Sequence, residues 1–225
     1  AASDVYKRQD QWGLQRIGFD ETPNSAWRLV KANAQPVVVG VIDTGLDWYH
    51  QNIDPENIWT NPKETPKNGI DDDHNGYIDD IVGWDFVDHD NRPWDFDGHG
   101  TLVAGIIAGS WKDKDGIAGV NPFAKLMILK ALNNFGHTRA SYVAEALAYA
   151  ADNGARVVNI SVGGAEKLTS IEQAAIDYAY SKGVVIVVAA GNEAADISQY
   201  GMASSDKVLT VAASGLDDQR AAFSN

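Results

Sequence analysis

Residues 37–43 read VVVGVID, an almost unbroken run of β-branched side chains that follows Pro36 and ends in a carboxylate. Such a run predicts a strand that is buried on both faces, as the strands of parallel sheets are. Ligands of open α/β sheets bind beyond the carboxyl ends of the strands. Asp43, followed by Thr44-Gly45, is therefore either a functional carboxylate or an Asp that caps a turn.

Strands and helices alternate along the rest of the chain. Further strands are predicted at 81–86, 126–132, 157–164, 184–192 and 208–214, and helices at 138–153, 170–183 and, in a short form, from Ala26-Trp27. The helix at 170–183 has Ser170 as its expected cap and ends at Gly183. The alternation predicts an α/β fold with a doubly wound, mainly parallel β-sheet and helices on both faces.

Composition excludes several classes of protein. The chain has 225 residues, enough for one α/β domain with a large core. Its net charge of −13 argues against a nucleic-acid partner, and it has no run of apolar residues long enough to span a membrane. It has no Cys, which excludes disulfides and thiol chemistry. Neither GxGxxG nor a P-loop motif follows a strand, which argues against a nucleotide-binding α/β enzyme.

Residues 98–109, GHGTLVAGIIAG, place His99 between two glycines at the start of a helix of small residues, with Thr101 as a possible cap. A single His in such a place is more often a hydrogen-bonded core residue. The alternative is proton transfer, because imidazole changes charge near neutral pH.

Polar groups also follow two later strands, at Ser161-Val162-Gly163 and at Gly191-Asn192. Parallel strands bring these ends to the same edge of the sheet as Asp43, and a helix that begins at His99 can lie over that edge. A carboxylate that orients an imidazole, and an amide that donates to an oxyanion, are most of what acyl transfer needs.

An acidic segment, NGIDDDHNGYIDD, occupies residues 68–80. Its oxygens follow the spacing of a calcium loop, with the predicted ligands Asp71, Asp73, Asn75, Tyr77 through its carbonyl, and Asp79. Position 12 is Val82, so the loop is not an EF-hand. The alternative is a solvated acidic turn. Asp88, Asp90 and Asp95 are weaker candidates for a second cation.

Four segments in this order, VVVGVIDTGLD, GHGTLVAGIIAG, VVNISVGG and VVAAGNE, together with QWGL near residue 11 and RAAFSN at 220–225, resemble the subtilisin-like serine endopeptidases, the subtilase family. The resemblance runs from about residue 10 to 225 and implies a hydrolase that cleaves protein or peptide substrates. It makes Asp43 the acid that orients His99, His99 the general base and Asn192 the oxyanion donor. Ser161, Val162 and Gly163 would pair with substrate backbone, with Gly136 across the cleft.

The chain departs from the family pattern at the nucleophile. The family's Gly-Thr-Ser-x-Ala motif is absent, and in the family it lies beyond the segment that RAAFSN resembles. We therefore expect the sheet to be incomplete at its C-terminal side and residues 1–225 alone to be inactive. Asn52 stands where a widespread calcium site of the family has Asp, so the chain departs from the family at that site and we make no prediction of calcium there. An alternative is a catalytically inactive, calcium-stabilised binding module.

The remaining expectations concern the ends of the chain. Residues 1–9 resemble a translated sequencing adapter and are interpreted as a non-native tail, which leaves 10–225 as part of a peptidase catalytic domain. The resemblance implies a secreted or cell-envelope protein that is made with its own propeptide.

Overall fold

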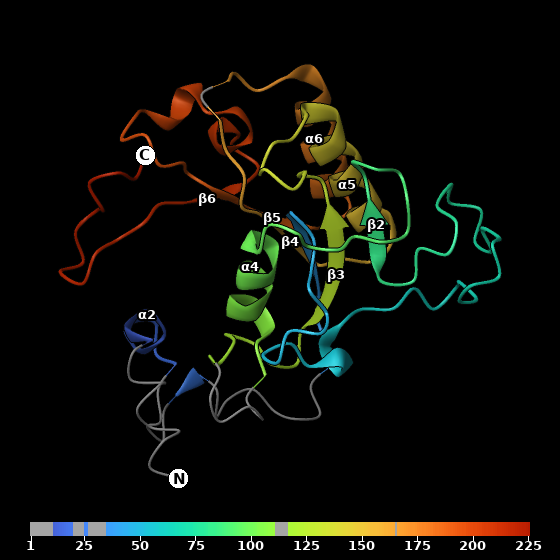
Figure 1. The fold of residues 1–225 in the computed structure, drawn as a ribbon. Helices are drawn as coiled ribbons and strands as arrows, with labels where there is room; N and C mark the ends of the chain where they lie inside the picture. The colour runs from blue at the N-terminus through green and yellow to red at the C-terminus, as the bar shows by residue number, and fades with distance from the viewer. Residues whose placement is uncertain (1–10, 20–24, 27–34, 111–116, 165) are drawn as a thin grey trace, which may run out of the picture.

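The computed structural model describes residues 11–19, 25–26, 35–110, 117–164 and 166–225 (Figure 1). The interpreted tail at 1–9 and the helix expected from Ala26-Trp27 lie outside these residues, apart from Ala26 itself. The elements are α2 (Trp12–Arg16), β1 (Val38–Asp43), η1 (Pro55–Asn57), β2 (Gly83–Asp85), α4 (His99–Ala108), β3 (Lys125–Lys130), α5 (Ala140–Asp152), β4 (Val157–Ile160), α6 (Ser170–Ser181), β5 (Val185–Ala189), η2 (Ile197–Gln199), η3 (Gly201–Ser204) and β6 (Leu209–Val211).

Six strands form one sheet in the order β2-β3-β1-β4-β5-β6, and every neighbouring pair is parallel. The sheet extends from β1 in both directions, with β3 and β2 on one side and β4, β5 and β6 on the other. The predicted doubly wound parallel sheet is confirmed. No helix in the described part of the chain combines the length and apolar character needed to cross a membrane.

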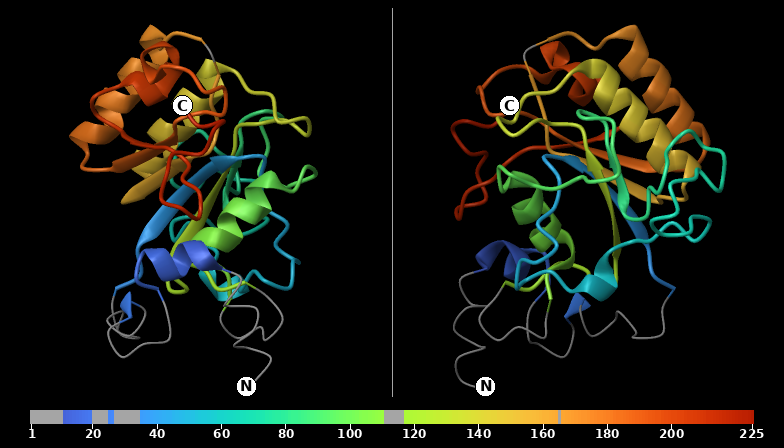
Figure 2. Two further views of the ribbon diagram at one scale, coloured as in Figure 1. Left: turned by 90° about the vertical axis from the view of Figure 1, so that its left-hand side faces the viewer. Right: turned by 45° about the vertical axis from the view of Figure 1, so that its right-hand side comes forward.

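Alternate residues of β1 belong to two separate cores. Val39 and Val41 belong to the core that contains Ala104 and Ala108 of α4, whereas Ile42 belongs to the core formed with α5 and α6. Figure 2 shows the sheet between α4 on one side and α5 and α6 on the other. Burial on both faces explains why residues 37–43 carry no polar side chain before Asp43.

A glycine in β1 lets α5 lie close to the sheet. A Cβ at Gly40 would be 3.2 Å from Cγ2 of Val158 and 3.4 Å from Cβ of Ala150. A larger side chain would push the helix away, so the small residues at 40 and 150 fit together.

Most predicted boundaries differ from the structure by a few residues, and for three of them the cause is clear. The strand expected at 157–164 ends at Ile160, because the residues that follow have no neighbouring strand with which to pair. The helix of residues 98–109 starts from Gly98, whose φ of 104° suits glycine, so Thr101 lies within its first turn. The later helix is capped by Thr169 in a capping box with Glu172, not by Ser170.

The α4 face of the sheet is uncovered over β5 and β6. Register partners in a sheet point to the same side, so Val185, Leu209 and Val211 share the face of Val39 and Val41. Leu209 is 59% exposed and Val211 is 54% exposed. The core of this half of the sheet therefore lies on the side of α5 and α6.

Candidate active site

Asp43 is the last residue of β1 and is completely buried. Its Oδ1 accepts a hydrogen bond of 2.8 Å from the backbone N–H of Thr44, and its Oδ2 has no hydrogen-bond partner among the described residues. Burial raises the pKa of Asp43 above its ordinary value, and hydrogen bonds from His99 and Thr44 oppose that rise. A buried carboxylate of this kind favours a partner that can become positively charged.

His99, the first residue of α4, is that partner. Its Nδ1 lies 2.7 Å from Oδ1 of Asp43. Because a carboxylate accepts hydrogen bonds, Nδ1 carries the proton in the neutral ring and Nε2 keeps its lone pair. Within the described part of the chain Nε2 has no hydrogen-bond partner, and 47% of the side chain is exposed. The ring is held from one side and can take a proton on the other.

The glycine after His99 allows α4 to approach the end of β1. A Cβ at Gly100 would lie 2.3 Å from the carbonyl oxygen of Gly45, which is too close for any side chain. The Gly100 N–H donates to Oγ1 of Thr44 over 2.9 Å. The flanking glycine is therefore what brings the imidazole within reach of Asp43.

The residues after β4 and β5 meet at the same edge of the sheet. Ile42 pairs with Ile160, and Ile160 pairs with Val188, so Asp43, Ser161 and Ala189 lie in one row. A Cβ at Gly163 would be 3.9 Å from Cα of Gly191, which places the segment 161–163 beside the loop that carries Asn192. These positions agree with the predicted convergence of strand ends.

The segment after β4 has unused backbone groups. Val162 and Gly163 form no backbone hydrogen bond with another described residue. Ser161 accepts a side-chain hydrogen bond of 2.8 Å from Asn159. An extended chain with free N–H and C=O groups can accept another strand alongside it.

The loop that carries Asn192 is shaped by Asn225. Asn225 accepts from the backbone N–H groups of Glu193 and Ala195, at 3.0 and 2.8 Å, and donates to the carbonyl oxygen of Ala190. Asn192 itself is exposed. The sequence alone does not single out Asn225, because its partners lie 30 to 35 residues earlier in the chain.

Gly136 lies in an exposed turn closed by a hydrogen bond from its N–H to the carbonyl oxygen of Asn133, with φ of 73°. The loop is connected to the site by the buried Lys130, whose Nζ donates to the carbonyl oxygens of Thr44 and Leu132 at 2.7 and 2.9 Å. No backbone hydrogen bond joins Gly136 to residues 161–163 in the described structure, and its role across the cleft stays a prediction.

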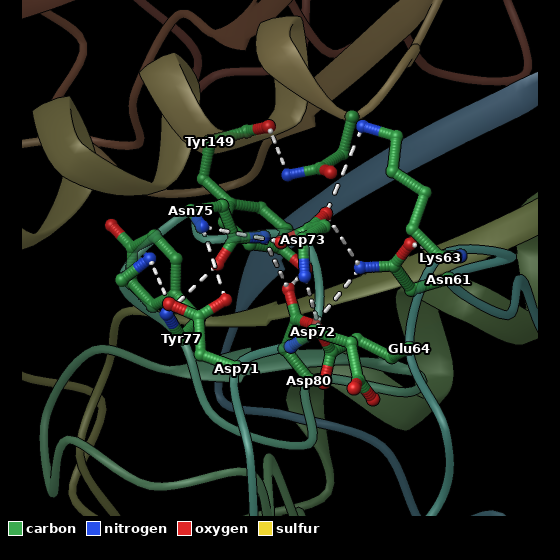
Figure 3. A network of polar contacts seen from close by, with 12 residues as sticks. Asn61, Lys63, Glu64, Asp71, Asp72, Asp73, Asn75, Tyr77, Asp80 and Tyr149 are labelled. Atoms are coloured by element: carbon green, nitrogen blue, oxygen red, sulfur yellow. Dashed lines mark hydrogen bonds and ion pairs between the residues drawn. The ribbon is translucent and has the colours of Figure 1, made fainter.

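The acidic segment forms a loop in which Asp71, Asp73 and Asp80 take part in one network of polar contacts with Asn61 and Glu64 (Figure 3). Oxygens of Glu64, Asp71 and Asp73 lie within 4.8 Å of one another, and this is the group of potential metal ligands in the described part of the chain. The buried Glu64 accepts hydrogen bonds from the N–H groups of Asp72, Asp73 and Asp79. Glu64 precedes the calcium-like spacing, which is why the spacing did not reveal it.

The other predicted ligands have different surroundings. Asp79 accepts from the N–H groups of Asn68 and Gly69, at 3.1 and 2.9 Å, and so caps that turn outside the group. Asn75 donates to Asp80 and accepts from the N–H of Tyr77. Among the residues that the structure describes, Asp88, Asp90 and Asp95 are not gathered into a group of metal ligands.

A buried carboxylate joins the acidic loop to α5. Asp80 is completely buried and accepts hydrogen bonds from the hydroxyl of Tyr149, from Asn61 and from Asn75. Burial raises the pKa of Asp80, and these three hydrogen bonds oppose the rise. The ring of Tyr77 stands edge-on to that of Tyr149, with centroids 4.9 Å apart. The loop is thereby fixed to the core by hydrogen bonds and by aromatic contacts of Tyr77.

Tyr149→Phe is expected to lower the free energy of unfolding by about 1–3 kcal/mol, because it leaves the buried Asp80 carboxylate with one donor fewer. Urea unfolding at pH 7 measures the change. The matched control is Tyr178→Phe, which removes an exposed hydroxyl that donates to Asp152 over 2.7 Å. Equal stability losses in the two variants would contradict the anchoring role of Tyr149.

Comparison with known proteins agrees with this architecture. The model of the subtilase family matches residues 34–225. The thermophilic serine proteinase of Bacillus sp. (strain AK1) is 35% identical over 223 residues, which cover 99% of this chain and 48% of that protein. Thermitase of Thermoactinomyces vulgaris is 38% identical over 222 residues, which cover 99% of this chain and 68% of thermitase.

A solved structure of a cold adapted subtilisin-like serine proteinase superposes with a TM-score of 0.68 at 28% identity, over 95% of this chain and 68% of that one. The chain thus spans about half the length of the first relative and two thirds of the second. The family match covers the strand that ends in Asp43, the helix that begins at His99 and the segments after β4 and β5. The chain belongs to the subtilase family.

Proposed function

We propose that the protein is a serine endopeptidase that hydrolyses peptide bonds through an Asp-His-Ser triad. The observation that carries the proposal is the 2.7 Å contact between Oδ1 of Asp43 and Nδ1 of His99, with Nε2 of His99 open to solvent. Two of the relatives described above are named as serine proteinases. The serine itself is proposed to follow Asn225, because residues 1–225 contain no Gly-Thr-Ser-x-Ala motif.

The proposed reaction follows from the roles of these groups. Nε2 of His99 removes the proton from the serine hydroxyl as its oxygen attacks the substrate carbonyl carbon, and Asp43 stabilises the imidazolium. The same Nε2 then gives that proton to the leaving amine. The side-chain amide of Asn192 donates to the oxyanion. Residues 161–163 pair with the extended substrate backbone, and Gly136 borders it on the other side.

We further propose a structural calcium ion in the acidic loop. Carboxylate oxygens are the ligands that Ca²⁺ prefers, and Glu64, Asp71 and Asp73 supply three carboxylates from one small loop. Asp71 and Asp73 belong to the predicted set of ligands, and Asn75, the carbonyl of Tyr77 and Asp79 are the remaining ligands proposed from the spacing. The ion would offset the mutual repulsion of these charges and would take no part in the reaction.

Two proposals concern the cellular setting. By family resemblance the protein is secreted or held in the cell envelope and is made with its own propeptide. Its other partners are proteins or peptides that it cleaves.

The test uses a form of the protein whose coding sequence continues beyond Asn225. Cleavage of an unstructured protein substrate, together with covalent labelling of one serine by a fluorophosphonate, is the expected result. A correctly folded protein that binds peptides but neither cleaves them nor becomes labelled would instead favour the calcium-stabilised binding module.

A further inference from the structure

Asp95 is a buried carboxylate, 6% exposed, that receives five hydrogen bonds. Its Oδ1 accepts from Oγ1 of Thr44 at 2.8 Å, from the N–H of Asp97 at 3.0 Å and from the N–H of Gly98 at 2.9 Å. Its Oδ2 accepts from the N–H and the hydroxyl of Thr101, at 2.9 and 2.6 Å. Each of these five partners is a neutral donor.

These bonds connect the residue after Asp43 to the residue after His99. Oγ1 of Thr44 donates to Asp95 and accepts from the N–H of Gly100, while the N–H of Thr44 donates to Oδ1 of Asp43. The Asp95 carboxylate is therefore connected to the Asp43–His99 pair through the Thr44 hydroxyl. The connection continues through the backbone of Thr44 and Gly100, which directly follow Asp43 and His99 in the chain.

A second path runs through Thr101. Its hydroxyl donates to Asp95 and accepts from the N–H of Asp47 over 2.9 Å. The backbone of the same segment adds two bonds, from the N–H of Leu46 to Pro93 and from the N–H of Asp95 to Leu46. The loop after β1 and the first turn of α4 are thus both held to the segment that contains Asp95.

We propose that Asp95, acting through the Thr44 hydroxyl, is a positioning residue that sets the geometry of the Asp43–His99 pair. The inference rests on the proposed function only in that this pair is the proposed catalytic pair. A carboxylate suits the place because both of its oxygens accept hydrogen bonds. An Asn at position 95 would replace one of these oxygens with an NH₂ group, which would face N–H or O–H donors and could not accept from them.

Charge agrees with this arrangement. Burial alone would raise the pKa of Asp95, but hydrogen bonds from Gly98, Thr101 and Thr44 together hold it below the ordinary value, so the group is ionised at neutral pH. An ionised acceptor forms stronger hydrogen bonds than a neutral one. The turn that carries His99 is therefore held by charge-assisted bonds on a group that does not face the solvent.

The experiment observes the His99 ring directly and does not require the serine nucleophile. The positioning role of Asp95 can therefore be refuted while the peptidase proposal holds, and the peptidase proposal can be refuted while the positioning role holds. In an NMR spectrum of the protein labelled with ¹⁵N-His, the proton on Nδ1 of His99 is expected to give a low-field resonance. Loss of this resonance in His99→Ala identifies it. Asp95→Asn and Thr44→Val should each broaden or shift it upfield. Thr44→Ser keeps the hydroxyl and should restore the wild-type resonance, and Asp90→Asn is the control for charge.

Two outcomes overturn the proposal. One is a Thr44→Val resonance that matches wild type, which remains decisive even where Asp95→Asn does not fold. The other is an Asp95→Asn protein that unfolds at lower urea with an unchanged His99 resonance. In a form that carries the serine, Thr44→Val is expected to lower kcat by about 10²-fold with little change in KM, because the substrate contacts are intact while the base is misplaced.

Discussion

His99→Ala is expected to lower kcat for peptide hydrolysis by about 10⁶-fold in a form of the protein that carries the serine, which is the size known for the corresponding histidine of subtilisin itself. The physical reason is the geometry at Asp43. The imidazole is the group placed to remove the serine proton, and its Nδ1 is held 2.7 Å from the carboxylate. Burst and steady-state kinetics on one substrate measure the change.

Related variants separate the roles within the site. Asn192→Ala should cost about 10²–10³-fold in kcat, again the size known from subtilisin, because it removes one oxyanion donor. His89→Asn is the matched control, since His89 is exposed, has φ of 55° and contacts Tyr142 away from the pair. If His99→Ala keeps more than about a tenth of the wild-type rate, the triad assignment is wrong, whatever the fate of the fold.

Removal of calcium is expected to lower the melting temperature by about 5–11 °C. This range combines the stabilisation by calcium binding with the change in melting temperature per kcal/mol. At a calcium concentration of about 100 Kd, binding to the folded state contributes about 2.7 kcal/mol. Each kcal/mol changes the melting temperature by about 2–4 °C in a domain of this size. Calorimetry with calcium and with excess chelator measures the difference.

Asp73→Ala should abolish this dependence on calcium, because it removes one of the three grouped carboxylates. Glu64→Gln should do the same, although the calcium-like spacing did not include it. The control is Asp88→Ala, which removes an exposed carboxylate of the same acidic region outside the group. A melt that is indifferent to calcium in the wild-type chain would leave the loop as a solvated acidic turn.

The strongest predictions from sequence concern elements whose burial dictates residue type. VVVGVID had to be a strand buried on both faces, since no polar side chain interrupts it before Asp43. The small residues of GHGTLVAGIIAG likewise required close helix packing, and the structure places α4 directly against β1. Both motifs are local, so local chemistry was enough.

The polar groups that hold the site together were less visible. Asp95 looked like one of several Asp in an acidic block, but its bond to Thr44 spans 51 residues. Glu64 is buried only because the loop of residues 71–79 folds back over it. Lys130 sat within an apolar strand, and only the neighbouring loops show what its ammonium group donates to.

The sequence by itself determined the parallel α/β architecture, the family, and which strand ends and which helix start carry the candidate chemistry. Periodicity, glycines and strand-terminal polar residues are properties of short segments, so they can be recognised before the tertiary structure is known. The tertiary structure alone decided what the other buried carboxylates contact, namely Asp95 with Thr44 and Thr101, and Glu64 with Asp71 and Asp73. Hydrogen bonds act over about 3 Å, and residues far apart in the chain come that close only when the strands and loops have folded together.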